Sequence, residues 1–307
     1  MSSTARQTQS FLRQRFEEAG IRPDTRHGQN FLIDLNLLDL LVTAADVGPD
    51  DVVLEVGTGL GSLTSRIAPL AAHVVTVEID PHLFQLASEE LADLANVTML
   101  RQDALQNKNH VDAAVLDAVQ TQLNVDSRRR FKLAANLPYN VATPILSNLL
   151  AGQPRPMSMT ATIQKELADR ICAKPGTKDY SALSIWMQSQ CTIEIVRTIP
   201  PQAFWPRPKV QSAIVHIVPA ADKRARIDDL GFFHRFVRGL FLHRRKFLRG
   251  VMATILRPGL SKAEVDEILA AFQLPTDVRA EQLPVEVLIG LANAAEKRCL
   301  RAGFKAD

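Results

Sequence analysis

The sequence predicts an α/β fold: a doubly wound parallel sheet flanked by helices, followed by a small all-helical C-terminal domain. Short apolar runs alternate with helical patterns through most of the chain. One run, residues 51–56, leads directly into Gly57-Thr58-Gly59-Leu60-Gly61 and then into a helical pattern, which is how such sheets open. Residues 220–226 shift to small and charged side chains, and only helical patterns follow. We therefore expect a first domain over 1–220 and a second over 221–307.

Composition narrows the class of protein. The chain has 307 residues, 46% of them hydrophobic, so it can bury one large core. Its net charge of +3 argues against indiscriminate binding to polyanions but leaves room for a local basic patch. The chain has no run of about 18 apolar residues and no apolar N-terminal signal, so we expect a cytoplasmic protein without membrane contact. The three cysteines lie far apart, which predicts reduced core thiols and no metal site.

The N-terminal residues 1–26 form a basic arm with five arginines against three acids. A solvated helix with frayed ends is the favoured interpretation of this arm. The next segment, Gln29-Asn30-Phe31-Leu32, combines two side chains that can hydrogen-bond a polar ligand with two that anchor the loop in the core. Asp34 and Asp80 are each placed to cap a helix, the first beginning near Leu35.

The glycine-rich turn after residues 51–56 lets a ligand approach the backbone closely. The helix that follows offers unpaired N–H groups at its first turn, and its apolar face is expected to hold Leu63, Ile67 and Leu70. The pattern is G-x-G-x-G, and no Gly-Lys-Ser/Thr is present. A phosphate-cradling P-loop is therefore excluded.

Acidic side chains lie at the ends of the next two predicted strands. The strand 74–79 contains Glu78, about 20 residues after Gly57, where a carboxylate can accept both hydroxyls of a ribose. The strand 97–100 is followed by Asp103, which can receive the amino group of an adenine. Because the carboxyl ends of parallel strands meet at one edge of the sheet, we expect these groups to converge there.

The motif around which the other motifs are organised is Asn136-Leu137-Pro138-Tyr139, which follows a predicted buried strand at 131–135. Asn136 offers a side-chain carbonyl that can accept a hydrogen from an exocyclic –NH2 group. Pro138 holds the backbone carbonyls in a sharp turn, and Tyr139 offers a flat ring on which a base can stack. The alternative for these four residues alone is a strand-to-helix turn with a buried tyrosine.

The remaining first-domain segments should complete the sheet, with helices at 111–123, 144–150 and 165–172 and strands at 157–163, 192–198 and 213–218. Before the last strand stands a proline-rich loop that begins with Phe204 and Trp205. We expect these rings to project beside Arg207 and Lys209 and to contact RNA bases and phosphates. A hydrophobic plug over the sheet edge is the alternative.

The second domain is expected to be helical near 229–242, 246–257, 261–272 and 284–300. Between Arg235 and Lys262 there are eight Lys or Arg and no Asp or Glu, which favours a phosphate-backbone contact over a merely solvated face. One helical face is expected to carry Arg238, Arg245 and Arg249, and a buried apolar stripe to hold Phe236, Leu240, Phe247 and Val251. The RNA contacts expected from both basic segments are Arg207, Lys209, Arg244, Arg245, Lys246 and Arg249.

Taken in order, these motifs closely resemble the KsgA family of ribosomal RNA adenine N6,N6-dimethyltransferases, nearly from end to end. The resemblance implies a Rossmann-like sheet that uses S-adenosylmethionine, with cofactor contacts from Asn30, Leu32, Gly57, Glu78, Asp103 and Asn136. It also implies that a flipped adenine is held by Asn136, Pro138, Tyr139 and Phe204. Family members act on two adjacent adenosines in a hairpin near the 3′ end of small-subunit rRNA, so the implied partner is the assembling 30S particle.

The chain departs from the family pattern at three places. Thr58 stands where the family often has Pro, and Ser181 stands where many members have Gly after Tyr180. The segment 111–130 is longer than in the best-known members and has no assigned role.

The reaction expected from these residues is direct displacement of a methyl group from a sulfonium onto nitrogen. The adenine amino group would donate to the Asn136 side-chain oxygen and the Pro138 carbonyl, which favours a pyramidal nitrogen with an available lone pair. Stacking on Tyr139 and Phe204 would offset the cost of extruding the base.

Three other functions fit parts of the pattern. A macrolide-resistance methylase of large-subunit rRNA shares the fold and a similar tetrapeptide, but the loop from Phe204 and the Arg244-Arg245-Lys246 run favour the small-subunit family. A non-catalytic RNA-binding assembly or transcription factor is disfavoured by the intact Glu78, Asp103 and Asn136. A dinucleotide dehydrogenase is the weakest alternative, because the final glycine of its fingerprint is absent.

Overall fold

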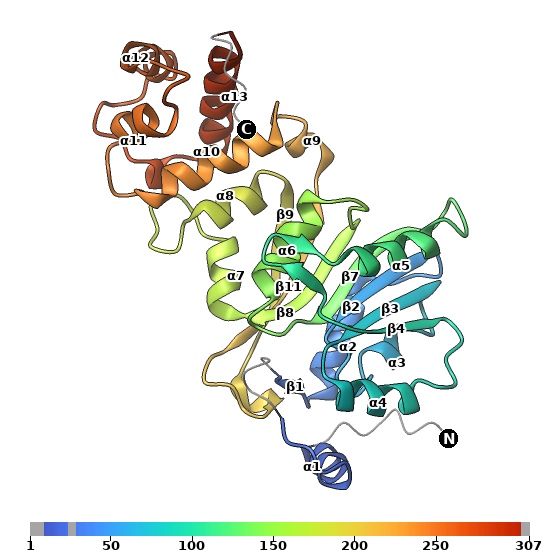
Figure 1. The fold of residues 1–307 in the computed structure, drawn as a ribbon. Coiled ribbons are helices and arrows are strands. Elements are labelled where there is room, and N and C mark those ends of the chain that lie inside the picture. The colour runs from blue at the N-terminus through green and yellow to red at the C-terminus, as the bar shows by residue number, and fades with distance from the viewer. Residues whose placement is uncertain (1–8, 24–28, 302–307) are drawn as a thin grey trace. The chain divides into compact units, whose positions relative to one another are not determined.

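The computed structural model describes residues 9–23 and 29–301, and the predicted basic arm (1–26) falls partly outside that range, at 1–8 and 24–26. The chain forms two compact units (Figure 1). The first, here called the sheet unit, combines residues up to Ala168 with Ile193–Pro219. The second, the helical unit, combines Asp169–Thr192 with the chain from Ala220 onward. No helix within the described ranges is long and apolar enough to cross a membrane.

The sheet unit is built on one seven-stranded sheet in the order β4-β3-β2-β7-β8-β11-β9. Its strands are β2 (Asp51–Val56), β3 (His73–Glu78), β4 (Val97–Arg101), β7 (Arg130–Asn136), β8 (Ser158–Gln164), β9 (Cys191–Ile199) and β11 (Ser212–Pro219). The five strands from β4 to β8 pair in parallel, and β11 runs antiparallel to β8. The predicted α/β class is confirmed, because continuous apolar runs form central strands that are buried on both faces.

Helices cover this sheet and bury its apolar side chains. They are α2 (Leu35–Ala45), α3 (Thr64–Ile67), α4 (Pro81–Glu90), α5 (Ala113–Leu123), α6 (Ala142–Ala151) and α7 (Lys165–Ile171). Helix α2 packs on β7, β8 and β11, whereas α5 packs on β2, β3 and β7. The side chains of Asp34 and Asp80 accept main-chain hydrogen bonds at the starts of α2 and α4, as the sequence predicts.

Helix α3 is shorter than its apolar pattern predicts. It ends at Ile67, and Leu70, which was expected on its buried face, is 44% exposed. Pro69 supplies the reason, because it lacks the N–H needed to continue a helix and its ring clashes with the preceding turn.

Small elements missing from the sequence prediction surround the carboxyl edge of the sheet. Strand β1 (Phe31–Leu32) pairs antiparallel with β10 (Phe204–Trp205), which follows the short helix η2 (Pro201–Ala203). Strands β5 (Leu105–Asn107) and β6 (His110–Val111) form a hairpin. The helix that the sequence does predict in the basic arm is α1 (Gln9–Glu18), but it is not merely solvated. It packs by its buried Phe16, whose ring centroid lies 5.5 Å from that of Phe31 and 5.3 Å from that of Trp205.

The helical unit contains α8 (Ala182–Gln188), α9 (Ala221–Arg224), α10 (Leu230–Leu242), α11 (Leu248–Ile255), α12 (Lys262–Ala271), η3 (Ala280–Gln282) and α13 (Val285–Arg301). Ser181 is the N-cap residue of α8, and its N–H donates to the Ser184 hydroxyl across 2.9 Å. The serine at this position therefore caps a helix. Residues 243–247 separate α10 from α11, so Arg245 lies in neither helix. The expectation that Arg238, Arg245 and Arg249 share one continuous helical face is therefore wrong.

The predicted apolar stripe of the helical unit is correct for three of its four members. Phe236, Leu240 and Val251 are buried, but Phe247 is 54% exposed. Phe247 stands at the N-cap of α11 with an extended backbone, so its side chain does not follow the helical periodicity on which the prediction rests.

Candidate active site

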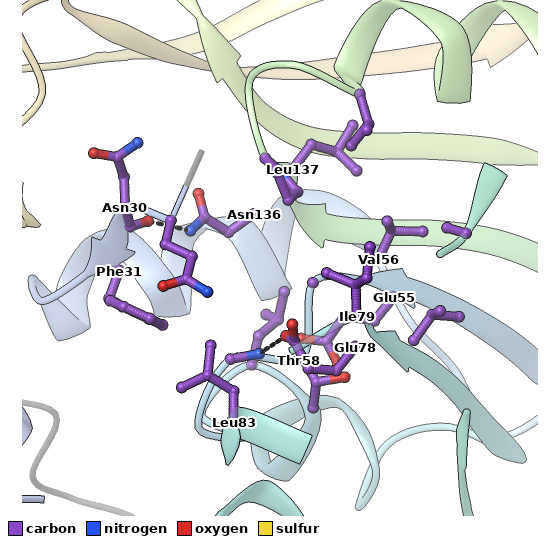
Figure 2. A pocket seen from close by; sticks show the side chains of 18 of the residues that line it. Asn30, Phe31, Glu55, Val56, Thr58, Glu78, Ile79, Leu83, Asn136 and Leu137 are labelled. Carbon is purple, nitrogen blue, oxygen red and sulfur yellow. Dashed lines mark hydrogen bonds between the residues drawn. The ribbon is translucent and has the colours of Figure 1, made fainter. Parts of the chain in front are cut away.

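A cavity of about 320 Å³ opens at the carboxyl edge of the sheet (Figure 2). Its walls come from segments that are distant in sequence: the β1 segment, the turn after β2, the ends of β3 and β4, and the start of the loop after β7. The cavity brings together Asn30, Leu32, Gly57, Glu78, Asp103, Asn136, Pro138 and Tyr139. Eight of the residues selected from the sequence thus line one pocket.

The glycine-rich turn supplies the floor of the cavity. Gly57 has φ +87°, and a Cβ placed there would lie 3.2 Å from the Pro138 ring. Gly59 has φ +59°, and its Cβ would lie 3.2 Å from the Phe31 ring. Side chains rarely adopt this left-handed backbone, so glycine is required at both positions. The turn therefore packs directly against the two segments that carry Asn30 and Asn136.

Glu78 lies at the end of β3, 5% exposed, with its carboxylate fixed by the backbone. One oxygen accepts the N–H of Gly59 at 2.9 Å, and the other accepts that of Asp80 at 3.0 Å. Burial raises the pKa of the Glu78 carboxyl, and these two hydrogen bonds oppose that shift only partly. Each oxygen keeps a second lone pair for a ligand hydroxyl.

Glu55 is a pocket residue that the sequence interpretation missed. Its side chain is 1% exposed and accepts hydrogen bonds from the hydroxyls of Thr64 and Thr76, the latter at 2.9 Å. Thr76 also lies 2.6 Å from the hydroxyl of Thr58. Burial raises the pKa of Glu55 to about 8. An acid inside an apolar run, directly before a glycine turn, is the signal that could have identified it.

The side chain of Asn136 is oriented by a pocket residue that is distant in the sequence, Asn30. Its Nδ2 donates to the main-chain oxygen of Asn30 at 2.9 Å (Figure 2). Because that contact uses the amide nitrogen, the Oδ1 atom is left as the acceptor of the side chain at the pocket. This is the orientation that recognition of an amino group requires.

The two residues that follow Leu137 are also held in place. The Pro138 carbonyl accepts the Val141 N–H at 3.1 Å, which closes the turn and leaves a second lone pair on that oxygen. The Tyr139 hydroxyl lies 2.6 Å from the hydroxyl of Ser212, the first residue of β11. Ser212 is fully buried, and burial raises the pKa of the Tyr139 phenol. The tyrosine ring is thereby fixed at both ends.

Two of the predicted site residues are placed differently from the rest. Phe204 is not part of the pocket lining, and Asp103 is exposed at its rim. Phe204 is 2% exposed and belongs to the core beneath α2, so the expectation that its ring projects outward is wrong. The antiparallel pairing places Phe204 opposite Leu32, a pocket residue that belongs to the same core cluster. Asp103 is exposed at the pocket rim, where one of its oxygens accepts the Leu105 N–H at 2.9 Å.

The basic residues predicted to bind RNA fall into two groups. Arg207, Lys209, Arg245 and Lys246 are exposed. Arg244 donates to the main-chain oxygens of Lys178 and Tyr180 and lies 3.4 Å from the Glu281 carboxylate. Arg249 pairs through two nitrogens with Asp266. The charges of Arg244 and Arg249 are therefore already engaged within the helical unit.

Within residues 9–23 and 29–301, no group of three or more His, Cys, Asp or Glu side chains is arranged to hold a metal ion. The three cysteines are free thiols, and Cys191 and Cys299 are buried.

Comparison with known proteins gives a consistent picture. The profile of the ribosomal RNA adenine dimethylase family matches residues 22–293. A ribosomal RNA small subunit methyltransferase A from Pediococcus pentosaceus is 39% identical over 279 residues, which cover 90% of this chain and 91% of that protein. The protein of the same name from Alkaliphilus metalliredigens is 40% identical over 261 residues, covering 84% and 87% of the two chains.

Solved structures show the same fold. A dimethyladenosine transferase from Plasmodium falciparum superposes with a TM-score of 0.72 at 22% identity, covering 86% of this chain and 97% of that one. The 23S rRNA methyltransferase ErmE superposes with a TM-score of 0.60 at 24% identity, covering 87% and 99%. At these identities the two structures establish the fold alone.

Proposed function

This chain belongs to the ribosomal RNA adenine dimethylase family, and from that premise we propose that its pocket binds S-adenosylmethionine and positions the N6 amino group of rRNA adenines for methylation. The enzyme is accordingly an S-adenosylmethionine-dependent rRNA adenine dimethyltransferase. The roles of individual residues follow from the geometry of the pocket.

The residues of the pocket fit the cofactor. The Glu78 carboxylate keeps lone pairs for the two ribose hydroxyls, and Asp103 at the rim can accept the amino group of the cofactor's adenine. Leu32, Ile79 and Leu83 supply apolar walls for its flat ring. When bound, the cofactor supplies a methyl group on an activated sulfonium, so the protein's task is to position and desolvate the nucleophile.

The observation that carries this proposal is the hydrogen bond from Asn136 Nδ2 to Asn30 O. It holds Oδ1 ready to accept one hydrogen of the target amino group, while the Pro138 carbonyl accepts the other. Both contacts draw the nitrogen toward a pyramidal geometry in which its lone pair faces the methyl donor. Asn136 carries no charge and is a weak base, so the proton leaves to water after transfer.

Two aromatic residues support the extruded base in different ways. Tyr139 lines the pocket, and its hydrogen-bonded ring offers a face for stacking. Phe204 was expected to stack as well, but its buried ring gives it another role in this conformation. We assign it to supporting the Leu32 wall of the pocket from behind.

The substrate we propose is the hairpin near the 3′ end of small-subunit rRNA in the assembling 30S particle, with two adjacent adenosines as targets. The name of the relatives, ribosomal RNA small subunit methyltransferase A, supports this choice. The exposed Arg207 and Lys209 beside Trp205 provide cations for its phosphates.

Mass analysis of rRNA tests this function. Small-subunit precursor particles and large-subunit rRNA are incubated in parallel with the protein and isotopically labelled S-adenosylmethionine. We expect two dimethyladenosines in the small-subunit rRNA and none in the large-subunit rRNA. Modification of the large-subunit rRNA alone would assign the chain to the macrolide-resistance type, and no modification together with no cofactor binding would assign it to a non-catalytic role. Asn136→Ala protein serves as the matched inactive control.

A further inference from the structure

A second cavity, of about 570 Å³, lies within the helical unit, where residues 243–246 meet the first turn of α11. Its lining includes Arg245, Lys246, Phe247, Gly250, Thr254 and Arg279. These residues come from two segments held together by the backbone. Phe247 and Arg279 form an isolated antiparallel bridge, and the Leu248 N–H donates to the Val278 oxygen at 2.8 Å. We call this cavity the α11 groove.

The α11 groove is strongly cationic. Arg245, Lys246 and Arg279 are exposed, and none of them has an ion-pair partner among the described residues. No carboxylate is part of the lining. The neighbouring Arg244 and Arg249 are instead neutralised by Glu281 and Asp266. Three unpaired cations around one concave surface favour an anionic ligand.

An exposed aromatic ring, that of Phe247, belongs to the same lining. The guanidinium carbon of Arg279 lies 6.0 Å from the centroid of the Phe247 ring, and the ring is still 54% exposed. The ring therefore offers a flat apolar face to solvent in the same lining as the three cations, and a planar ligand can cover that face. A Cβ added at Gly250 would meet nothing within 4 Å, so the groove has open space beside the ring.

A flat aromatic face and three cations without a carboxylate partner among the described residues together match one chemical class, a nucleotide that is not base-paired. Its base can stack on an aromatic ring and a guanidinium plane, and its phosphates can pair with arginine and lysine. An acidic peptide would use the cations but would leave the ring without a partner. We propose that the α11 groove binds an unpaired nucleotide of the RNA substrate, with its base on Phe247 and Arg279 and its phosphate at Arg245 and Lys246.

This inference rests on the proposed function in that it takes RNA as the substrate, and it adds a second point of recognition outside the cofactor pocket. Two probes separate the base from the phosphates: a short fluorescein-labelled single-stranded RNA and the same strand with abasic central nucleotides. Binding of both to the full chain is measured by fluorescence anisotropy at several salt concentrations, because phosphate contacts depend on salt.

The variants separate stacking from charge. We expect Phe247→Ala to weaken binding of the intact strand about tenfold and to leave binding of the abasic strand unchanged. Phe247→Trp should retain the affinity for the intact strand, and its indole fluorescence should be quenched by that strand alone. Gly250→Leu should fill the groove and weaken binding of the intact strand without removing a charge. Replacing both Arg245 and Lys246 by Ala should weaken binding of both strands and lower the slope of log K against log salt by about 0.7 for each phosphate contact that is lost.

Two controls make the outcome decisive. Lys262→Ala removes an exposed cation outside the groove and should leave the preference for the intact strand unchanged. Binding of S-adenosylmethionine by every variant, measured by calorimetry, should equal that of the wild type. If Phe247→Ala weakens binding of both strands equally, or of neither, the nucleotide site is overturned. That result leaves the proposed function intact when the wild-type protein still methylates rRNA, whereas failure of methylation would overturn the function itself.

Discussion

The Nδ2 atom of Asn136 lies 2.9 Å from the main-chain oxygen of Asn30, although 106 positions separate the two residues in sequence. This contact decides which atom of the amide faces the pocket. A free asparagine side chain could present either its oxygen or its nitrogen, and only the oxygen can accept a hydrogen from an amine. The β1 segment therefore determines which atom of the Asn136 amide is presented to the pocket.

Asn136→Ala should abolish acceptance of the target amino group while leaving the cofactor contacts of Glu78 in place. Removing an oriented polar group at a reacting centre costs about 10²–10³-fold in kcat. We expect such a loss, with the Kd for S-adenosylmethionine changed by less than about tenfold. Single-turnover methylation and calorimetry measure the two quantities separately.

Asn136→Asp is the matched variant, because it keeps the size of the side chain and replaces the amide nitrogen by an oxygen. That oxygen would face the Asn30 carbonyl without a hydrogen between them, so we expect the orientation to be lost and activity to fall. Equal losses of cofactor affinity and of rate in both variants would contradict this division of roles.

Glu78 should make cofactor binding sensitive to pH. In the proposed function its carboxylate accepts hydrogens from the ribose hydroxyls of the cofactor, so the ionised form would be the binding form. Because burial raises the pKa of Glu78, protonation and loss of affinity should occur at a higher pH than for an ordinary glutamate. Calorimetric titration with S-adenosylmethionine between about pH 5 and 8 checks this. Glu78→Gln should bind about 10–100-fold more weakly and lack the step, and an unchanged pH profile in that variant would refute the assignment.

Glu55 should make the fold less stable as the pH rises. Its pKa in the folded protein is about 8, whereas the ordinary value is 4.5, so between these values the folded state holds a proton that the unfolded state has released. The free energy of unfolding must then fall with increasing pH, by at most about 1.4 kcal/mol per pH unit. Urea denaturation of the wild type and of Glu55→Gln across this window tests the prediction. The variant keeps an acceptor for Thr64 and Thr76 and should show a flatter profile.

The hydrogen bond between Tyr139 and Ser212 should contribute to the rate of methylation without affecting the cofactor. Ser212→Ala and Tyr139→Phe each remove one partner of a contact of 2.6 Å. We expect each to lower kcat by about two- to tenfold, with the Kd for S-adenosylmethionine unchanged. The kcat of the double variant should be no lower than that of the less active single variant, because both changes remove the same interaction. Additive losses would show that the two hydroxyls act independently.

Much of the sheet unit could be predicted from sequence because its signals are local. Apolar runs at 51–56 and 131–135 become β2 and β7, and the aspartates before α2 and α4 cap them as expected. The convergence of Gly57, Glu78 and Asn136 follows from the parallel order of the strands, since their carboxyl ends share one edge.

The contacts that the sequence does not reveal depend on tertiary packing. The pairing of β1 with β10 joins segments more than a hundred residues apart and turns Phe204 into the core. The break between α10 and α11 contains neither Pro nor Gly. It coincides with Arg244, whose hydrogen bonds to the Lys178 and Tyr180 carbonyls form only in the folded unit. Phe247 is exposed as a result of that break.

The ladder between β1 and β10 consists of two residue pairs, Phe31 with Trp205 and Leu32 with Phe204. A slip by a single position would carry the neighbouring Asn30 carbonyl about 3.3 Å along the strand, farther than the Asn136 amide can follow. The same slip would also exchange the inward and outward sides of the aromatic pair. The register of these two pairs therefore sets the position of the Asn30 carbonyl against which the Asn136 amide is oriented.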